Sequence, residues 1–426
     1  MPLSIAASAG LILLLLGIPV GVALILIPLL FLWMDPQVPL LVIPQRMFGA
    51  IDSFPLMAVP FFVLVGQVMN AGGITDKIFN FSNCLIGHVR GGLAQVNILA
   101  SVFMSGMSGS AVADASGLGQ VEIKVMTDEG YDPAFSAAVT AASATVGPII
   151  PPSIPLVIVG AVTGTSISQL LVAGIIPGIL MALAMCLVVA WFAVRNNLPT
   201  RPRASMRELS VSFIEALPAL LAPLVLVGGI LAGIFTPTEA SAVAALYSIV
   251  VAMFYYKELS LGRLFAVLVE TSIVVGAIFF IIAGAAATSW LFTWVGVPQT
   301  LAQWIGGTVT NPWLLLLVIN LFLLIVGCFL EVNAALILVA PLLLPMATNA
   351  GIDPVHFGMM MVMNLMIGLI TPPVGMNMFI VMQIAKISMP QFMKAIAPFL
   401  LILLVVLLLL TYVPWLSLAI PTWAFR

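Results

Sequence analysis

Two short stretches decide the fold of this chain: residues 145–153 read TVGPIIPPS and residues 368–375 read GLITPPVG. Each places a double proline inside a long apolar run. Proline lacks a backbone donor and frees carbonyls of the preceding turn, so each stretch predicts a break in a helix. If these runs lie in hydrocarbon, the freed backbone groups need partners from within the protein, because unpaired groups there are costly.

The composition places the chain in a membrane. Of its 426 residues, 63% are hydrophobic and 7% are charged, whereas soluble domains carry about 25% charged residues. Apolar runs long enough to span a bilayer recur, for example at 10–33, 313–330 and 399–413. Long continuous runs favour helices over the alternating strands of a barrel. We expect an all-α polytopic membrane protein with roughly ten to thirteen membrane segments.

Charge is informative mainly in one stretch. Arg195, Arg201, Arg203 and Arg207 cluster there, and short arginine-rich loops normally stay in the cytoplasm, so residues 195–212 are predicted to form a cytoplasmic loop. The net charge of −2 gives no indication of a nucleic-acid partner. We predict one integral membrane domain over residues 1–426, with the lipid bilayer as its surroundings.

The chain contains an internal repeat. An ungapped shift of 221 positions, which places Pro133 on Pro354, superposes eight residues that govern backbone shape. The matched pairs are Gly106 with Gly327, Gly130 with Gly351, Asp132 with Asp353, Pro133 with Pro354, Gly147 with Gly368, Pro151 with Pro372, Pro152 with Pro373, and Pro177 with Pro398. We therefore predict two structural repeats, about 1–194 and about 213–426.

Each repeat contains two predicted helix breaks. The double-proline stretches form one pair, and the stretches 104–114 (MSGMSGSAVAD) and 326–333 (VGCFLEVN) form the other. In secondary transporters, interrupted helices at matching positions of paired repeats mark the binding site. A structural interpretation also exists, because neighbouring helices, serines or water can satisfy a proline kink without any ligand.

The chemistry of such breaks suits two kinds of ligand. Freed carbonyls and Ser or Thr hydroxyls are hard oxygen ligands for a small hard cation. The N-termini of half-helices carry partial positive charge and favour an anionic substrate. One construction can therefore hold a cation and a carboxylate together.

Two acidic residues lie in or beside the breaks. Asp114 and Glu331 are functional candidates because an ionisable side chain within a membrane span is costly. Neutralising a bound cation, carrying a proton and capping a half-helix are all open roles for each. Asp132 and Asp353 precede prolines in matching Gly-x-Asp-Pro turns and are predicted N-caps.

The sequence also lacks the motifs for ATP hydrolysis and for catalysis, which restricts the functions that it can have. The sequence has no phosphate-binding Gly-x-x-x-x-Gly-Lys-Ser/Thr loop. A cation gradient is the simpler source, since one charge crossing 100 mV releases roughly 2.3 kcal/mol. No His, Cys or paired-Asp arrangement offers a catalytic site, so we do not expect an enzyme or an organic cofactor.

The motifs GSAVAD, GPIIPPS, Gly-Ile-Asp-Pro and GLITPPVG, with Gln45-Arg-Met-Phe and the stretch 59–62, together resemble the large membrane subunit of TRAP transporters of the dicarboxylate and sialic acid type. The resemblance covers essentially the whole chain. It implies a sodium-coupled, elevator-type importer in a bacterial inner membrane. It also implies a small four-helix membrane subunit and a soluble periplasmic substrate-binding protein as partners, and an organic acid as substrate.

The resemblance also implies two sodium sites, built mostly from backbone carbonyls, with the substrate between them. The first site is carried over to Ser108, Ser110, Gly147, Ile150 and Pro151, and the second to Gly327, Gly368, Thr371 and Val374. Candidates for substrate binding or coupling are Asp114, Glu331, Pro152, Pro372 and Pro373.

Other functions remain as alternatives. The main one is a self-sufficient ion-coupled carboxylate carrier of similar hairpin architecture that needs no soluble receptor. An intramembrane enzyme or a membrane scaffold subunit are more remote. A scaffold gives no reason for four breaks in register.

Overall fold

The computed structural model describes residues 2–15, 18–34, 39–196, 198, 200–297, 300 and 311–425, and the described residues form helices and connections without a strand. The first repeat contributes α1 (Pro2–Leu15), α2 (Val20–Met34), α3 (Val42–Ile51), η1 (Phe54–Met57), α4 (Ala58–Ala71), α5 (Ile74–Ile86), α6 (Gly92–Ser108), α7 (Ala111–Ser116), α8 (Leu118–Asp128), α9 (Pro133–Ala144), α10 (Ile154–Thr163), α11 (Ile167–Ala173) and α12 (Ile175–Arg195).

The second repeat follows the same plan in its described residues. Its helices are α13 (Met206–Leu231), α14 (Pro237–Val250), the π-helical η2 (Val251–Tyr255), α15 (Leu261–Trp294), α17 (Pro312–Phe329), α18 (Val332–Asn349), α19 (Pro354–Gly368), α20 (Met376–Ala385), α21 (Met389–Tyr412) and α22 (Trp415–Ala424).

All four predicted helix breaks are present. The first separates α6 from α7, the second α9 from α10, the third α17 from α18, and the fourth α19 from α20. The shift of 221 residues also relates helix ends: α6 ends at Ser108 and α17 at Phe329, and α8 ends at Asp128 and α18 at Asn349. The all-α fold with two repeats of interrupted helices is confirmed.

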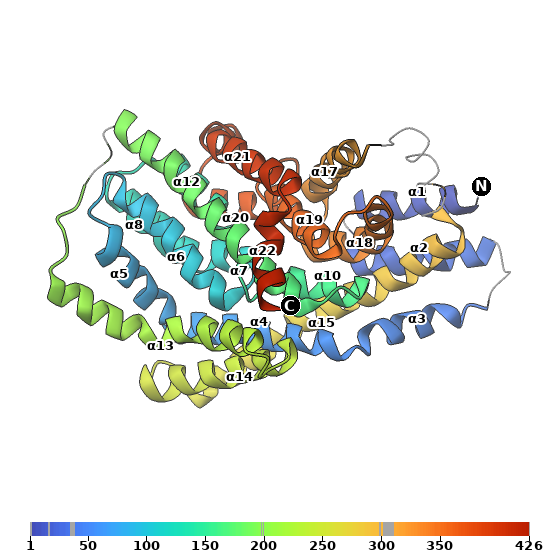
Figure 1. The fold of residues 1–426 in the computed structure, drawn as a ribbon, viewed down its shortest axis with the longest axis horizontal. Helices are drawn as coiled ribbons and strands as arrows, with labels where there is room; N and C mark the ends of the chain where they lie inside the picture. Colours follow the sequence, from blue (N-terminus) through green and yellow to red (C-terminus); the bar gives the residue numbers. More distant parts are fainter. Residues whose placement is uncertain are drawn as a thin grey trace.

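The two repeats exchange their half-helices. The half-helix α10, after the break in repeat 1, packs on α18 of repeat 2, whereas α20 of repeat 2 packs on α7, α8 and α9 of repeat 1. Before the breaks, α6 packs on α9 and α17 on α19 within each repeat. The four breaks are therefore gathered at the contact between repeats, in the middle of the molecule in Figure 1.

A second set of helices surrounds this centre. Helix α4 packs on α14 and α15, and α13 packs on α5 and α14. In Figure 1, α13, α14, α4 and α3 follow one edge of the molecule, and α12, α21 and α17 follow the opposite edge. Helix α15 has 34 residues, about 51 Å at 1.5 Å per residue. It contacts α2, α3, α4 and α18.

The expected ten to thirteen membrane segments include helices of two lengths. Within the described residues, eight helices are long and apolar enough to cross a membrane, and five more are apolar but shorter. Four of these five, α6, α10, α19 and α20, end or begin at a break. An apolar run therefore does not equal one complete span when a break divides it.

The run at 10–33 is likewise not one span. It covers the end of α1 and most of α2, which pack on each other. Residue Ile18 precedes Pro19, and a residue before proline is disfavoured in a helical conformation. A Cβ at Gly10 would lie 2.4 Å from Ile27 Cγ1, so the small residue allows the two helices close contact.

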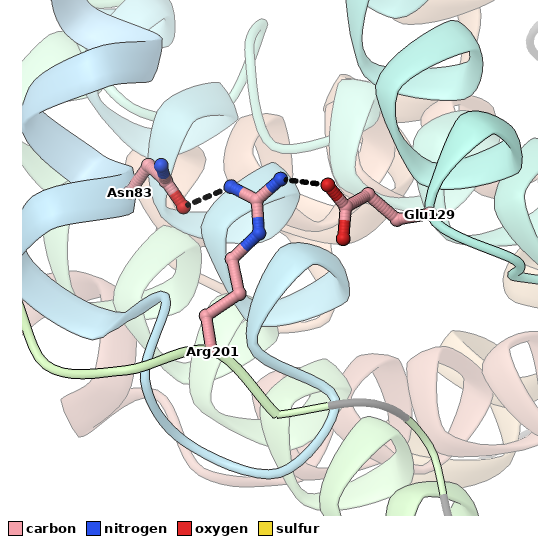
Figure 2. Close-up of polar contacts among 3 residues, drawn as sticks. All are labelled: Asn83, Glu129 and Arg201. Carbon is pink, nitrogen blue, oxygen red and sulfur yellow. Dashed lines mark hydrogen bonds and ion pairs between the residues drawn. The ribbon is translucent and has the colours of Figure 1, made fainter.

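The polar connection between the repeats is shorter than the predicted 195–212. Helix α13 begins at Met206, where Ser205 and Glu208 form a capping box. That Ser-x-x-Glu signal is visible in the sequence. Figure 2 shows how the connection is held: the Arg201 guanidinium donates to Glu129 Oε1 at 2.6 Å and to Asn83 Oδ1 at 3.2 Å. Its cytoplasmic side stays a prediction.

The predicted N-caps are confirmed. The Asp132 carboxylate accepts from the Phe135 N–H at 3.3 Å, and the Asp353 carboxylate accepts from the Val355 N–H at 2.8 Å. Both residues begin the helices that lead to the double prolines, so the two repeats share the cap as well as the break.

Buried polar networks join α6 to α9 in repeat 1 and α17 to α19 in repeat 2. In repeat 1, Asn97 Nδ2 of α6 donates to Thr140 Oγ1 of α9 at 2.7 Å, and Ser143 Oγ donates to Asn97 Oδ1 at 2.7 Å. In repeat 2, Asn364 of α19, at the position equivalent to Ser143, donates to Asn320 Oδ1 of α17 at 2.7 Å. These bonds connect α6 to α9 and α17 to α19 at positions that precede the breaks.

The first prediction concerns this network. Asn97→Leu removes both bonds and leaves buried hydroxyls of α9 with fewer partners, which costs about 1–3 kcal/mol. We expect the melting temperature of the detergent-purified protein to fall by several degrees. The same substitution at the exposed Asn80 of α5 is the control and should leave the melting temperature unchanged. An equal melting temperature for both variants would contradict the network's role.

Candidate functional site

A cavity of about 520 Å³ lies where the four breaks meet. Ser108 to Ala113 line it from the first break and Pro148 with Ile154 from the second; Glu331 to Asn333 line it from the third and Leu369 with Met376 from the fourth. Its size is within the range of small-molecule sites. The repeats therefore build one shared cavity.

The first break is shaped by a close approach to the second. Gly109 adopts a positive φ of 58°, and a Cβ there would lie 2.6 Å from the carbonyl oxygen of Pro152. Only glycine fits this position without strain. Ser110 then begins α7 as its N-cap, with its Oγ accepting from the Ala113 N–H at 3.4 Å.

Asp114 ties the first break to the second. Ser108 Oγ donates to Asp114 Oδ1 at 2.5 Å, and Asp114 Oδ2 lies 2.7 Å from where a Cβ on Gly147 would stand. Asp114 is buried, and its Oδ2 has no hydrogen-bond partner among the described residues. The carboxylate is therefore held against the backbone at Gly147 with one oxygen atom unsatisfied.

The second break is held by a side chain and by two glycines. Ser153 caps α10, and its hydroxyl donates to the carbonyl of Pro148. Gly174 and Gly178 of the following helices allow close contact, because a Cβ at Gly178 would lie 2.3 Å from Ile150 Cγ1. The peptide bond between Pro151 and Pro152 is cis, as is the one between Pro372 and Pro373.

The third and fourth breaks touch through their backbones. A Cβ at Gly368 would lie 2.4 Å from the carbonyl carbon of Gly327, so no side chain fits between them. The Val374 N–H donates to the carbonyl of Cys328 at 3.1 Å, across the same contact. Thr371 Oγ1 donates to the carbonyl of Ile367 at 2.7 Å, which leaves the lone pairs of its oxygen available.

Glu331 acts as a helix cap in this structure. Its carboxylate accepts from the Ala334 N–H at 3.0 Å and from Asn333 Nδ2 at 2.8 Å. It also lines the cavity, where it carries the only ionisable side chain among the described lining residues. Capping and ligand binding are compatible for one carboxylate, because each oxygen atom accepts more than one bond.

The structure separates the predicted site residues into two groups. Ser108, Ser110 and Glu331 line the cavity. The others lie in or next to the breaks but are not among the lining residues: Asp114, Gly147, Ile150, Pro151 and Pro152 in repeat 1, and Gly327, Gly368, Thr371, Pro372, Pro373 and Val374 in repeat 2.

Sequence reasoning missed the opposite wall. Gln67 and Asn70 of α4 line the cavity, as do Ile273, Val274 and Ile278 of α15. The two carboxamides stand three residues apart in the otherwise apolar helix AVPFFVLVGQVMNA, a spacing that places them on one helix face. That spacing was a signal in the sequence.

Comparison with known proteins identifies the family. The family model described as "Tripartite ATP-independent periplasmic transporter, DctM component" matches residues 9–416. The chain belongs to the DctM family of TRAP transporter subunits. The sequence-based expectation of a TRAP large subunit is therefore confirmed.

Two TRAP relatives match almost the whole chain. The sialic acid TRAP transporter large permease protein SiaM of Vibrio cholerae is 44% identical over 405 residues, covering 95% of each chain. The C4-dicarboxylate TRAP transporter large permease protein DctM of Pseudomonas aeruginosa is 39% identical, covering 89% of this chain and 88% of its own. Since these relatives are permeases, this TRAP subunit is a multi-pass inner-membrane transporter component and not an enzyme.

A solved structure shares the fold. The YdaH transporter of Alcanivorax borkumensis, a protein of unusual topology, superposes with a TM-score of 0.64, and the match covers 88% of each chain. Sequence identity is 15%, so this likeness concerns the arrangement of helices alone.

The second prediction tests the backbone contact between the third and fourth breaks. Gly368→Ala places a methyl group against the backbone of Gly327, which cannot move aside as a flexible side chain would. We expect the free energy of unfolding to fall by about 1–3 kcal/mol, which is measured as a lower melting temperature. Gly228→Ala, where a Cβ meets nothing within 4 Å, is the control. Unchanged melting of Gly368→Ala would refute the close contact.

Proposed function

We propose that this TRAP subunit is a sodium-coupled secondary transporter that imports an organic acid delivered by a periplasmic binding protein. The observation that carries the proposal is the single cavity on which all four helix breaks converge. Relatives named for sialic acid and for C4-dicarboxylates support an organic acid as the substrate class.

The first sodium site would lie behind the first and second breaks. Its ligands would be the Ser108 and Ser110 side chains or carbonyls and the carbonyls of Gly147, Ile150 and Pro151. The buried carboxyl group of Asp114 supports this assignment, because its unsatisfied oxygen atom would be a ligand or a compensating charge for a bound cation. Asp114 accepts a hydrogen bond from the Ser108 hydroxyl. The lone pairs of the Ser108 oxygen would then point away from Asp114, toward a bound cation.

The second sodium site would lie at the third and fourth breaks. Gly327 and Gly368 bring two chain segments into backbone contact, so carbonyls from both are available at short range. Thr371 keeps its lone pairs available because its hydroxyl proton is donated to Ile367. Val374 would add a carbonyl, and Glu331 a compensating charge from the cavity side.

The carboxylate of the substrate would lie between the two cation sites. The N-termini of α10, α18 and α20 begin at the cavity, and their partial positive charges favour an anion. The double prolines Pro151–Pro152 and Pro372–Pro373 begin the connections to two of these helices. The substrate and the cations would then stabilise one another electrostatically, which is the coupling that a symporter requires.

The transport cycle would be of the elevator type. The interlocked half-helices of the two repeats suit a body that moves as one unit, and α4, α5, α13, α14 and α15 suit a frame beside it. The small four-helix membrane subunit would bind that frame, and the periplasmic binding protein would deliver the acid to the assembled complex.

The third prediction tests the function as a whole. Proteoliposomes that contain this subunit and the small membrane subunit, supplied with the periplasmic binding protein, should take up a labelled organic acid only with an inward sodium gradient. Omission of either partner should abolish uptake. Sodium-driven uptake by this chain alone would instead establish a self-sufficient carrier.

The fourth prediction concerns the sodium ligands. Ser108→Ala, Asp114→Asn and Thr371→Ala each remove a ligand or a compensating charge. Each should raise the sodium concentration for half-maximal uptake by roughly fivefold to tenfold, which corresponds to about 1–1.4 kcal/mol. Thr127→Ala, on α8 outside the cavity, is the control. An unchanged sodium dependence for a variant would remove that residue from the site.

A further inference from the structure

The wall of the cavity that faces the breaks carries an unusual set of side chains for a membrane helix. Val63, Gly66, Gln67 and Asn70 of α4 line the cavity and share one helix face by their spacing. Carboxamides in an apolar helix are costly unless they find hydrogen-bond partners. Their position at a cavity indicates that a ligand supplies those partners.

The Asn70 side chain is fixed by a neighbour. Thr75 Oγ1 donates to Asn70 Oδ1 at 2.9 Å, which leaves the Asn70 amide as a donor. Its Nδ2 lies 3.1 Å from where a Cβ on Gly117 would stand, at the end of the segment whose Ser116 also lines the cavity. A preoriented donor of this kind discriminates between ligands more sharply than a mobile one.

Two further amide groups have free hydrogen-bonding capacity. Gln67 makes no side-chain hydrogen bond to another residue that the structure describes. Asn333, across the cavity at the third break, donates to Glu331 at 2.8 Å, but its Oδ1 is buried without a partner among the described residues. The cavity therefore offers neutral donors and acceptors on two sides.

The charge of the cavity narrows the ligand class. Within the described lining, the only ionisable group is the acidic Glu331, and no Lys, Arg or His contributes. A second carboxylate of a ligand would face neutral amides and Glu331, so its lost hydration would not be replaced by a cationic side chain. Hydroxyl and amide groups of a ligand both donate and accept hydrogen bonds. The carboxamides of the cavity do the same, so they would pair with such a ligand.

We infer that Gln67, Asn70 and Asn333 form a neutral recognition site for the hydroxylated end of the substrate, and that this subunit prefers a polyhydroxylated monocarboxylate to a dicarboxylate. The inference rests on the proposed function, in which the single carboxylate lies at the helix N-termini between the cation sites. The three amides then determine specificity through hydroxyl groups at the other end. This assigns substrate selection to the membrane subunit itself, in addition to any selection before delivery.

The test uses three six-carbon probes: gluconate, with one carboxylate and five hydroxyls; adipate, with two carboxylates; and hexanoate, with one carboxylate alone. Their affinities are measured by thermal-shift titration of the purified membrane complex in nanodiscs, at saturating sodium and without sodium. We expect gluconate to bind at least tenfold more tightly than adipate or hexanoate. In Gln67→Met this preference over hexanoate should fall about fivefold, as expected for one lost net hydrogen bond.

Two further variants make the result interpretable. Gln67→Glu keeps an acceptor but loses the donor, so it should also reduce gluconate binding while the complex keeps its sodium-induced stabilisation. Gln120→Met, on an exposed position of α8, should leave all three affinities unchanged. Tighter binding of adipate than gluconate, or an equal loss for gluconate and hexanoate in Gln67→Met, would overturn the inference.

The same titrations separate this inference from the proposed function. Sodium-dependent binding of all three acids without a preference for gluconate would contradict the recognition site and leave sodium coupling intact. Binding of gluconate that does not depend on sodium would instead contradict the coupling. A complex that binds none of the probes would overturn the recognition site, since gluconate is the predicted ligand.

Discussion

A helix that is interrupted inside a bilayer exposes backbone groups that must find hydrogen-bond partners, and the centre of this molecule is organised around that constraint. The carbonyls of Pro148 and Leu369 occupy equivalent positions before the two double prolines. The first accepts from the Ser153 hydroxyl and the second from the Met378 N–H at 3.3 Å. The repeats thus meet the same need with different donors.

The same constraint accounts for the packing of the repeats. A break leaves half-helices too short to span a membrane alone, such as the ten residues of α10 and of α20. Each half-helix packs on helices of the other repeat: α10 packs on α18, and α20 packs on α7 and α8. This exchange brings the four helix breaks to one cavity. A binding site is therefore a consequence of how the breaks are buried.

Local signals in the sequence predicted much of this centre. The breaks, the caps at Asp132 and Asp353, and the equivalence of the repeats all follow from residues that act on their own backbone. The run at 10–33, expected as one span, divides into two helices that pack on each other, and Pro19 immediately precedes the second of them. The Ser205 capping box was a local signal that was overlooked. The contribution of Gln67 and Asn70 could not be placed, because only the tertiary fold brings α4 against the breaks.

The role of Asp114 shows how far local reasoning reaches. The sequence marked it as a costly intramembrane carboxylate, and three roles were open. The structure pairs it with Ser108 and sets it against Gly147, so it does not cap a helix. Its partner and the glycine belong to segments more than thirty residues apart along the chain, which is why the sequence alone left the choice open.

The central claim is that cation and acid bind to one shared site and strengthen each other's binding. Its most direct test is thermodynamic linkage: the affinity of the purified membrane complex for sodium, measured with and without saturating organic acid, and the affinity for the acid, measured with and without saturating sodium. Linkage requires the two affinities to change by the same factor, and we predict a factor well above one. Affinities that do not depend on each other would contradict a shared site.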